Sequence, residues 1–337
     1  MPGLLTRRLQ VAAEIESISG TAMTLTAVDA NILAYEPVFN FNPTQFKRDP
    51  YRATLSRMNS EPGLQLCELT FKCELMGPAI ANAGTASAVG VFLRACAMQE
   101  ALVASTSNTY TPISTAMKTV TIAVYEDGLK KQLCGAMGNA KITCNVGEPI
   151  MVEFTFTGKY SSHSDTAMLV PTYPASKPLI FQNATVTVLG DTLLLNTLEI
   201  DLQNEVSMRT DPTDATGYAF AKVTARNPVM TFDPEQELVA THDFISKVKS
   251  TTEAAISIVV TATDQTQLTI SMPKARYTGI SGGDRDGIRT YSATMELNMS
   301  ASAGNDELSL AFLGTTTSTT TTSTTTTSTS TTSTTLA

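Results

Sequence analysis

The feature that most constrains the fold is a series of segments in which apolar and polar residues alternate. The clearest lies at 67–75, where Cys67, Leu69 and Phe71 alternate with charged residues and threonine. A period of two is typical of a β-strand with one buried and one exposed face. Further segments of this kind lie at 120–124, 132–144, 150–156, 198–202, 219–226, 256–262, 268–272 and 291–299. We therefore expect a mainly β protein.

The order of these segments repeats. Residues 64–160 contain a strand, a short helix, a hairpin and another strand, and the same order returns at 218–299. The helix candidates are 89–102 and 240–250, each with apolar residues on one face. Asp127-Gly128 marks the first hairpin turn, and Asp264-Gln265 takes its place in the second half. Because the halves share little identity, the alternatives are a true duplication and a similar order in unrelated β segments.

Two prolines suggest a boundary between the halves. Residues 169–177 include Pro171 and Pro174 and follow neither periodicity, which is typical of a linker. We expect one β-sandwich domain at 1–170 and a second at 171–314, each with a short helix. Long loops are expected at 35–63 and 205–217, both of which are polar and carry Arg-Asp elements.

Residues 315–337 consist almost entirely of threonine and serine. Serines recur at intervals of five, at Ser318, Ser323, Ser328 and Ser333. One interpretation is a flexible or O-glycosylated C-terminal tail. The other uses the high β propensity of threonine and has tails of neighbouring subunits pairing into a polar β structure. The sequence leaves both open.

Charge and length exclude several classes of protein. The chain has 337 residues, and 42% of them are hydrophobic, which is enough for two cores. A net charge of -8 argues against a surface that grips nucleic acid through phosphates. The N-terminus lacks the apolar run of a secretory signal, and no window approaches the length of a membrane span. We expect folding in the cytoplasm and no membrane partner.

Residue types that could perform catalysis or bind a metal are few. Five irregularly spaced cysteines argue against a disulfide framework and are expected to be buried apolar side chains. Ser162, His163 and Asp165 have the types of a nucleophilic triad, but neighbours in a flexible linker cannot converge on one site. Residues 282–287 resemble the start of a calcium loop without its distal glutamate, so a Gly/Asp hairpin turn is expected.

Other constellations also point away from an enzyme. Cys134 and Cys144 lack zinc-ligand spacing, and no phosphate-binding glycine loop occurs. Glu199 and Asp201 share one face of a strand, which is more typical of a solvated sheet than of a glycosidase cleft. We expect no catalytic, cofactor or metal site.

Several segments in order resemble siphophage tail tube proteins, and the resemblance covers most of residues 4–313. It starts with Leu4-Leu5-Thr6-Arg7-Arg8, Glu14 and Gly20-Thr21. It continues through 91–96 and Thr109-Tyr110-Thr111-Pro112 to the strand 152–160, and it closes with residues 302–308. No single motif is diagnostic; the order and spacing carry the likeness. The Thr/Ser tail departs from the common pattern.

The resemblance implies a specific fold and assembly. Each domain would be a β-sandwich with a short helix, and sheets of neighbouring subunits would join into a barrel around a central channel. Rings would stack head to tail through long loops and arms, and DNA would pass through the channel during ejection. Most relatives form rings of six single-domain chains, so a duplicated chain would form rings of three with pseudo-sixfold symmetry; six chains is the alternative.

Residue roles and partners follow from the same resemblance. The candidates for the channel wall are Glu153, Glu199, Asp201 and Glu296, where like charge would keep phosphates from adhering. The candidates for ring stacking, as opposed to surface decoration, are Lys47, Arg48, Asp49, Arg209 and Asp211. The expected partners are other copies of the chain, a tape measure protein, and tail terminator and baseplate proteins. The protein would belong to the virion tail and assemble in the host cytoplasm, with no cofactor.

Two other functions are compatible with a mainly β chain of this kind. A baseplate hub or head-tail joining protein of related fold would act in one or a few rings and would not polymerise. A secreted β-sandwich adhesin with a Thr-rich stalk would need a secretion signal, which the sequence does not show.

Overall fold

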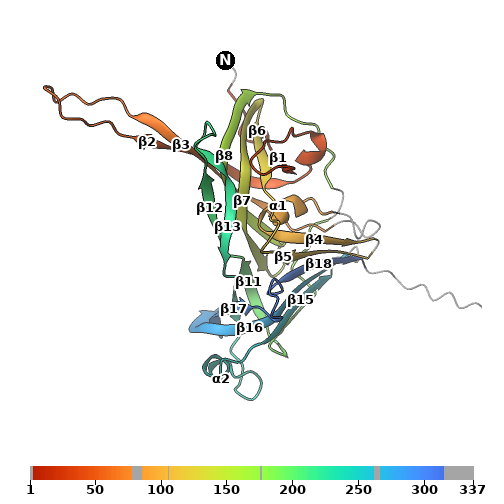
Figure 1. The fold of residues 1–337 in the computed structure, drawn as a ribbon. Coiled ribbons are helices and arrows are strands. Elements are labelled where there is room, and N and C mark those ends of the chain that lie inside the picture. Colours follow the sequence, from red (N-terminus) through yellow and green to blue (C-terminus); the bar gives the residue numbers. More distant parts are fainter. Residues whose placement is uncertain (1–2, 78–85, 105, 175–176, 262–265, 315–337) are drawn as a thin grey trace, which may run out of the picture.

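The computed structural model describes residues 3–77, 86–104, 106–174, 177–261 and 266–314. Figure 1 shows an elongated body built almost entirely of strands, with one long hairpin projecting from it as an arm. Two short helices accompany the strands, α1 in the body and α2 at its lower end. The mainly β fold with short helices that the sequence predicts is confirmed.

The first half contains eight strands, one 3-10 turn and one helix in its described residues. They are β1 (Leu9–Ile15), η1 (Ala27–Ala30), β2 (Ala34–Phe46), β3 (Glu61–Glu74), α1 (Gly90–Ala95), β4 (Met98–Val103), β5 (Ser107–Pro112), β6 (Val120–Glu126), β7 (Leu129–Asn145) and β8 (Met151–Asp165).

The second half adds ten strands and one helix in the part that the structure describes. They are β9 (Ala184–Val188), β10 (Asp191–Thr192), β11 (Leu195–Asp201), β12 (Asn204–Thr210), β13 (Tyr218–Arg226), β14 (Val229–Pro234), α2 (Phe244–Lys249), β15 (Ala254–Thr261), β16 (Thr266–Arg285), β17 (Ile288–Asn298) and β18 (Ser309–Gly314).

Six strands of each half share one order in the sheet. Neighbouring strands in the first half follow the order β1-β6-β7-β8-β3-β2. The second half follows β9-β15-β16-β17-β14-β11, with each strand at the same place along its half. Helices α1 and α2 also correspond, since each lies before the central hairpin. The repeat read from the sequence is therefore present in the strand order.

The halves are joined edge to edge in one antiparallel sheet. Residues 197–201 of β11 pair with residues 141–145 of β7, below the point where β6 stops pairing with β7. At the end of the chain, β18 pairs with both β16 and β5. One hydrophobic core extends through both halves. It includes Phe71 of the first half and Tyr277 of the second. No strand closes this sheet into a barrel within the described part of one chain.

Aromatic side chains fill the core of the first half. Phe71 lies 4.9 Å from Phe92 of α1 and 5.6 Å from Phe154 of β8, measured between ring centroids. All three rings are buried. The alternation at 67–75 is thus explained, since every second side chain of β3 points to these rings while its neighbours face solvent.

The helices are shorter than the sequence suggests. Helix α1 ends at Ala95, because Ala97 adopts a φ of 59° and the chain turns into β4. The expected helix at 89–102 is therefore correct only in its first part. In α2, the side chain of Asp243 accepts a hydrogen bond from the amide of Ser246 at 2.9 Å and so caps the N-terminus.

The two expected loops are instead hairpins. At 35–63, strands β2 and β3 pair down to Phe46 and Glu61, and only residues 47–60 lie between them. At 205–217, β12 begins a hairpin whose return strand is β13. The loop prediction is wrong because the projecting parts of the arm, 35–46 and 61–66, expose both faces, so no apolar period of two marks them.

Several smaller predictions can also be compared with the structure. Ser162, His163 and Asp165 lie in strand β8 and not in a flexible linker, so Ser162 and His163 point to opposite faces of the sheet. Asp127-Gly128 and Asp286-Gly287 form tight turns with positive φ, as predicted for hairpin connections. All five cysteines are buried with free thiols, and burial raises the pKa of Cys67 and Cys144 to about 12.

Two predictions concern the remaining segments. The Thr/Ser tail at 315–337 and the turn at Asp264-Gln265 lie outside the described residues. Among the helices that the structure describes, none has the length and apolar character needed to cross a bilayer.

The aromatic core gives a stability prediction. Phe71→Ala should lower the free energy of unfolding by about 3–5 kcal/mol, because it leaves a cavity beneath Phe92 and Phe154. Urea denaturation followed by circular dichroism measures the change. Phe46→Ala is the control: this side chain on the arm is 70% exposed, and a change within about 0.5 kcal/mol is expected. Equal losses in the two variants would contradict the assigned core.

Candidate functional site: one charged sheet face and its hairpins

The four acidic residues singled out in the sequence lie on one continuous face of the sheet. Glu153, Asp201 and Glu296 occupy a single cross-strand row, and Glu199 lies two residues along β11 from Asp201. In order across the strands the row reads Lys72, Glu153, Lys141, Asp201, Val229, Glu296 and Arg276. The side chains before and after each acid point into the core. This face is therefore the one opposite the core.

Basic residues stand beside these acids. Lys141 Nζ lies 3.0 Å from Glu199, and Arg276 Nε lies 3.1 Å from Glu296. Lys72 Nζ is 4.0 Å from Glu153. The hydrogen bond to Glu199 raises the pKa of Lys141, so this lysine stays protonated at neutral pH. The row thus alternates in sign except at Val229, which separates Asp201 from Glu296, whereas the sequence pattern pointed only to the acids.

Threonines occupy several other positions on this face. Thr70, Thr155, Thr143 and Thr231 lie on neighbouring strands at the parity of the charged row. A face of hydroxyls and paired ions is well hydrated and carries no apolar patch. It can pass a polyanion without binding it tightly, because its cations are already paired.

Hairpin β12–β13 lies across part of the first half. Ala221 and Val223 of β13 pack with Ala97 and Met137, and these four buried residues form a separate small core. Asn204, the first residue of β12, donates to the carbonyl oxygens of Cys96 at 2.9 Å and Gly138 at 3.0 Å. Two contacts therefore join the halves: this hairpin and the β7–β11 ladder.

A partly buried ion pair fixes the tip of this hairpin. Lys159 Nζ of β8 lies 2.6 Å from Asp214 Oδ2, and their side chains are 10% and 26% exposed. Burial alone would raise the pKa of Asp214, but hydrogen bonds from Lys159 and Thr216 outweigh it and lower the pKa to about 2. The amide of Gln65 also donates to the carbonyl of Thr216 at 3.0 Å. The tip thus reaches the base of the arm.

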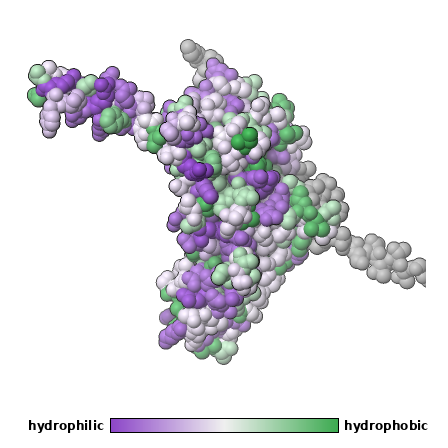
Figure 2. Space-filling view, in the orientation of Figure 1, coloured by the Kyte–Doolittle hydropathy of each residue, from purple (hydrophilic) through white to green (hydrophobic). Residues whose placement is uncertain are grey.

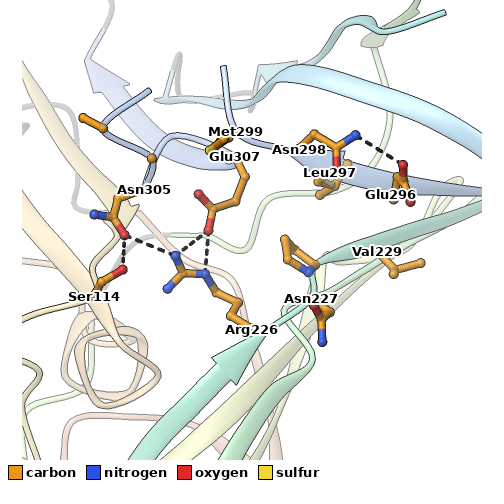
Figure 3. Close-up of a pocket in the computed structure, with 13 residues that line it drawn as sticks. Ser114, Arg226, Asn227, Val229, Glu296, Leu297, Asn298, Met299, Asn305 and Glu307 are labelled. Atoms are coloured by element: carbon orange, nitrogen blue, oxygen red, sulfur yellow. Dashed lines mark hydrogen bonds and ion pairs between the residues drawn. The ribbon is translucent and has the colours of Figure 1, made fainter. Parts of the chain in front are cut away.

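A second ion pair fixes the other end of the hairpin, where β13 continues into β14. Figure 3 shows the Arg226 guanidinium between Glu307 and Asn305, at the edge of a shallow hollow. Arg226 Nε donates to Glu307 at 2.6 Å, and Arg226 Nη1 donates to the carbonyl of Ile113 at 3.2 Å. Three distant segments of the chain meet at this one side chain.

The arm exposes apolar side chains. Figure 2 shows apolar and polar residues intermixed along it, well away from the body. Phe46 is 70% exposed, and Tyr51 and Leu55 in the connection between β2 and β3 are fully exposed. Large apolar side chains on a projecting hairpin indicate a surface that another molecule covers.

The five stacking candidates lie at two hairpin tips. Lys47, Arg48 and Asp49 begin the arm's tip, where Arg48 Nη1 lies 3.3 Å from Glu61 across the hairpin. Arg209 instead stacks on Phe220, with its guanidinium carbon 4.8 Å from the ring centroid. Asp211 accepts from the amide of Thr213 at 2.9 Å and shapes the turn. The structure does not bring the two groups together, and the second group has local partners.

Sequence reasoning missed a buried polar network in the second half. His242 Nδ1 lies 2.7 Å from Asp191, and its Nε2 lies 3.1 Å from the Tyr277 hydroxyl. Lys247 Nζ also contacts Asp191 at 2.8 Å. Burial lowers the pKa of His242. The network ties α2 to β10 and β16, and a lone histidine before a helix gives no signal of it in the sequence.

A comparison with protein families identifies a match over most of the chain. The family described as "Phage tail tube protein" matches residues 6–294. This range includes the charged row, the arm and hairpin β12–β13. No curated protein matches the chain.

The Lys159–Asp214 pair predicts a specific pH dependence. The pKa of Asp214 is lower in the folded chain than in the unfolded one, so its stabilisation is present above about pH 4 and is lost as the pH falls towards about 2. Asp214→Asn should lower the free energy of unfolding at pH 6 by about 1–2 kcal/mol, and the difference from wild type should shrink at acidic pH.

Denaturation at several pH values measures this difference. Glu61→Gln is the control, because Glu61 belongs to an exposed pair on the arm. A loss that stays constant from pH 6 to pH 2.5 would contradict the role of the ion pair.

Proposed function

The chain belongs to the phage tail tube protein family, a structural component of the virion tail, and from that premise we propose that it is the major tube subunit of a long non-contractile tail, as in siphophages. In this proposal the chains form rings, the rings stack, and the stack encloses a channel for DNA. The observation that carries the proposal is the pair of equivalent modules joined through β7 and β11. A module that already pairs edge to edge with its twin can continue the same pairing between chains.

Three chains would complete one ring. Each chain supplies two modules of equal strand order, so a ring of three presents six similar modules around the axis. A ring of six chains is the alternative and would contain twelve modules.

The charged face is proposed as the wall of the channel. It is the sheet face opposite the core, and it carries Glu153, Glu199, Asp201 and Glu296 together. Their basic partners make the wall nearly neutral, and the acids keep the lysines and arginines from holding phosphates. DNA would therefore slide without specific binding.

Contacts along the tube axis are proposed for the hairpin tips. Lys47, Arg48 and Asp49 stand at the projecting end of the arm, where they can reach another ring. Arg209 and Asp211 would contribute the opposing surface. The further partners proposed are a tape measure protein within the growing tube and terminator and baseplate proteins at its ends, with assembly in the host cytoplasm.

Electron microscopy of the purified protein tests this function. We expect hollow tubes in negative stain and threefold averages with six similar lobes when the tubes are viewed end on. Single rings that never stack would favour a baseplate hub or head-tail joining protein. A monomer at all concentrations would contradict the proposal.

Charge reversal tests the channel wall. In phage that carry Glu153→Lys with Glu296→Lys, both partner cations lose their acids, so the wall becomes positive and DNA release should slow several-fold. Release is timed by fluorescence of ejected DNA after receptor addition. Glu148→Lys with Glu237→Lys makes the same change in net charge in segments outside the row and should leave the rate unchanged. Equal rates in both double variants would remove these residues from the wall.

A further inference from the structure

The joint between the two halves of one chain provides a template for the joint between chains. Within the chain, β11 pairs with the lower part of β7, and the hairpin that follows it crosses to the end of α1. Because the halves have the same strand order, each partner in this joint has an equivalent in the other half. One equivalent, residues 32–35, lies in the first half, and the other, residues 276–280, lies in the second half.

The equivalent of β11 is the short segment 32–35, which leads into β2. Tyr35 lies opposite Lys72, which lies opposite Glu153; in the second half, Asp201 lies opposite Val229, which lies opposite Glu296. Ile32 is buried and Leu33 exposed, in the same alternation as Leu198 and Glu199.

A backbone feature supports this alignment. Glu36 follows the segment with a φ of 49°, and Gln203 follows β11 with a φ of 47°. Non-glycine residues seldom adopt positive φ, so its recurrence within one residue of the aligned position marks similar bends. The arm β2–β3 beyond Glu36 is therefore the counterpart of hairpin β12–β13.

The equivalent of the lower part of β7 is residues 276–280 of β16. Arg276 lies opposite Glu296 as Lys141 lies opposite Glu153. On one side, β15 pairs with β16 only as far as Ala275, just as β6 stops before the β11 ladder on β7. Within the described residues, β17 is the single strand that pairs with β16 from Arg276 onward. This edge is open where β7 holds β11.

The other part of the joint is the hairpin that covers the end of α1, and the end of α2 is the equivalent surface. Ala97 follows α1 with a φ of 59°, and Thr251 follows α2 with a φ of 52°. Ala97 is completely buried in the small core beneath hairpin β12–β13. Thr251 and its neighbours Thr252 and Glu253 are exposed. The surface that a hairpin covers in the first half is uncovered in the second.

We propose that residues 32–35 and the arm β2–β3 of one copy dock on the second half of the next copy, with 32–35 pairing antiparallel to 276–280 of β16 and the arm lying over the end of α2. This inference rests on the proposed function, because it requires the chain to assemble with itself. The occupant is another copy because both open surfaces belong to this chain and match a joint that it already forms internally. Exposed Val38 and Phe41 lie on the part of the arm that follows residues 32–35.

Disulfide cross-linking tests the register. The ladder Asp201 to Lys141 predicts that Tyr35 faces Arg276 of the next copy. Tubes assembled from Tyr35→Cys, Arg276→Cys double variants should form intermolecular disulfides under mild oxidation, and the ladder on a denaturing gel should end at three chains. The matched control, Lys141→Cys with Asp201→Cys, should close within one chain. Each single variant should stay uncrosslinked, because the native cysteines are buried.

A measurement on the unmodified protein removes any dependence on the variants. Amide hydrogen exchange of wild-type tubes, compared with unassembled protein, should show protection of 32–35, 276–280 and 250–253 that rises by more than about tenfold. Tubes in which these segments exchange as fast as in the free chain, or in which only the internal control cross-links, would overturn the joint while leaving the tube function intact. Failure of the wild-type chain to form tubes would overturn both.

Discussion

Everything in this structure depends on the backbone hydrogen bonds at the margins of a sheet. A strand with one unpaired side leaves amide and carbonyl groups that only water or another strand can satisfy. Where β6 stops pairing with β7, β11 of the other half takes its place. The same gap below β15 on β16 stays open in one chain. This difference between two modules of the same central strand order is the basis of the assembly that we propose.

The two hairpins show how one topology supports two uses. In the first half, β8 remains paired with β3 as far as Leu66, so the arm continues the direction of its own sheet. In the second half, β17 ends at Asn298 and the chain resumes pairing only at β18. Hairpin β12–β13 has no adjacent strand that extends beyond β17. It bends onto the first half, where the ion pairs of Lys159 and Arg226 hold it. The projecting hairpin and the folded-back hairpin thus differ in the length of the strand beside them.

The charged face follows from strand alternation combined with cross-strand register. Alternation places Glu153 and Glu296 opposite the core, but register decides which cations stand beside them. Lys141 and Arg276 occupy equivalent positions in the two modules, and each contacts an acid on a neighbouring strand. Exposed pairs of this kind contribute little to stability, so their main effect is on the potential of the surface.

The amino-acid sequence by itself determined the β class, the short helices and the repeated order, because these depend on local patterns such as the alternation at 67–75 and the turn at Asp127-Gly128. It also identified the acids of the charged face. It did not identify the arm as a hairpin, since strands exposed on both faces carry no apolar period. Only the tertiary structure decided that β11 joins β7 and that β16 keeps an open edge, because pairing between strands far apart in the chain depends on backbone position, which no local pattern encodes.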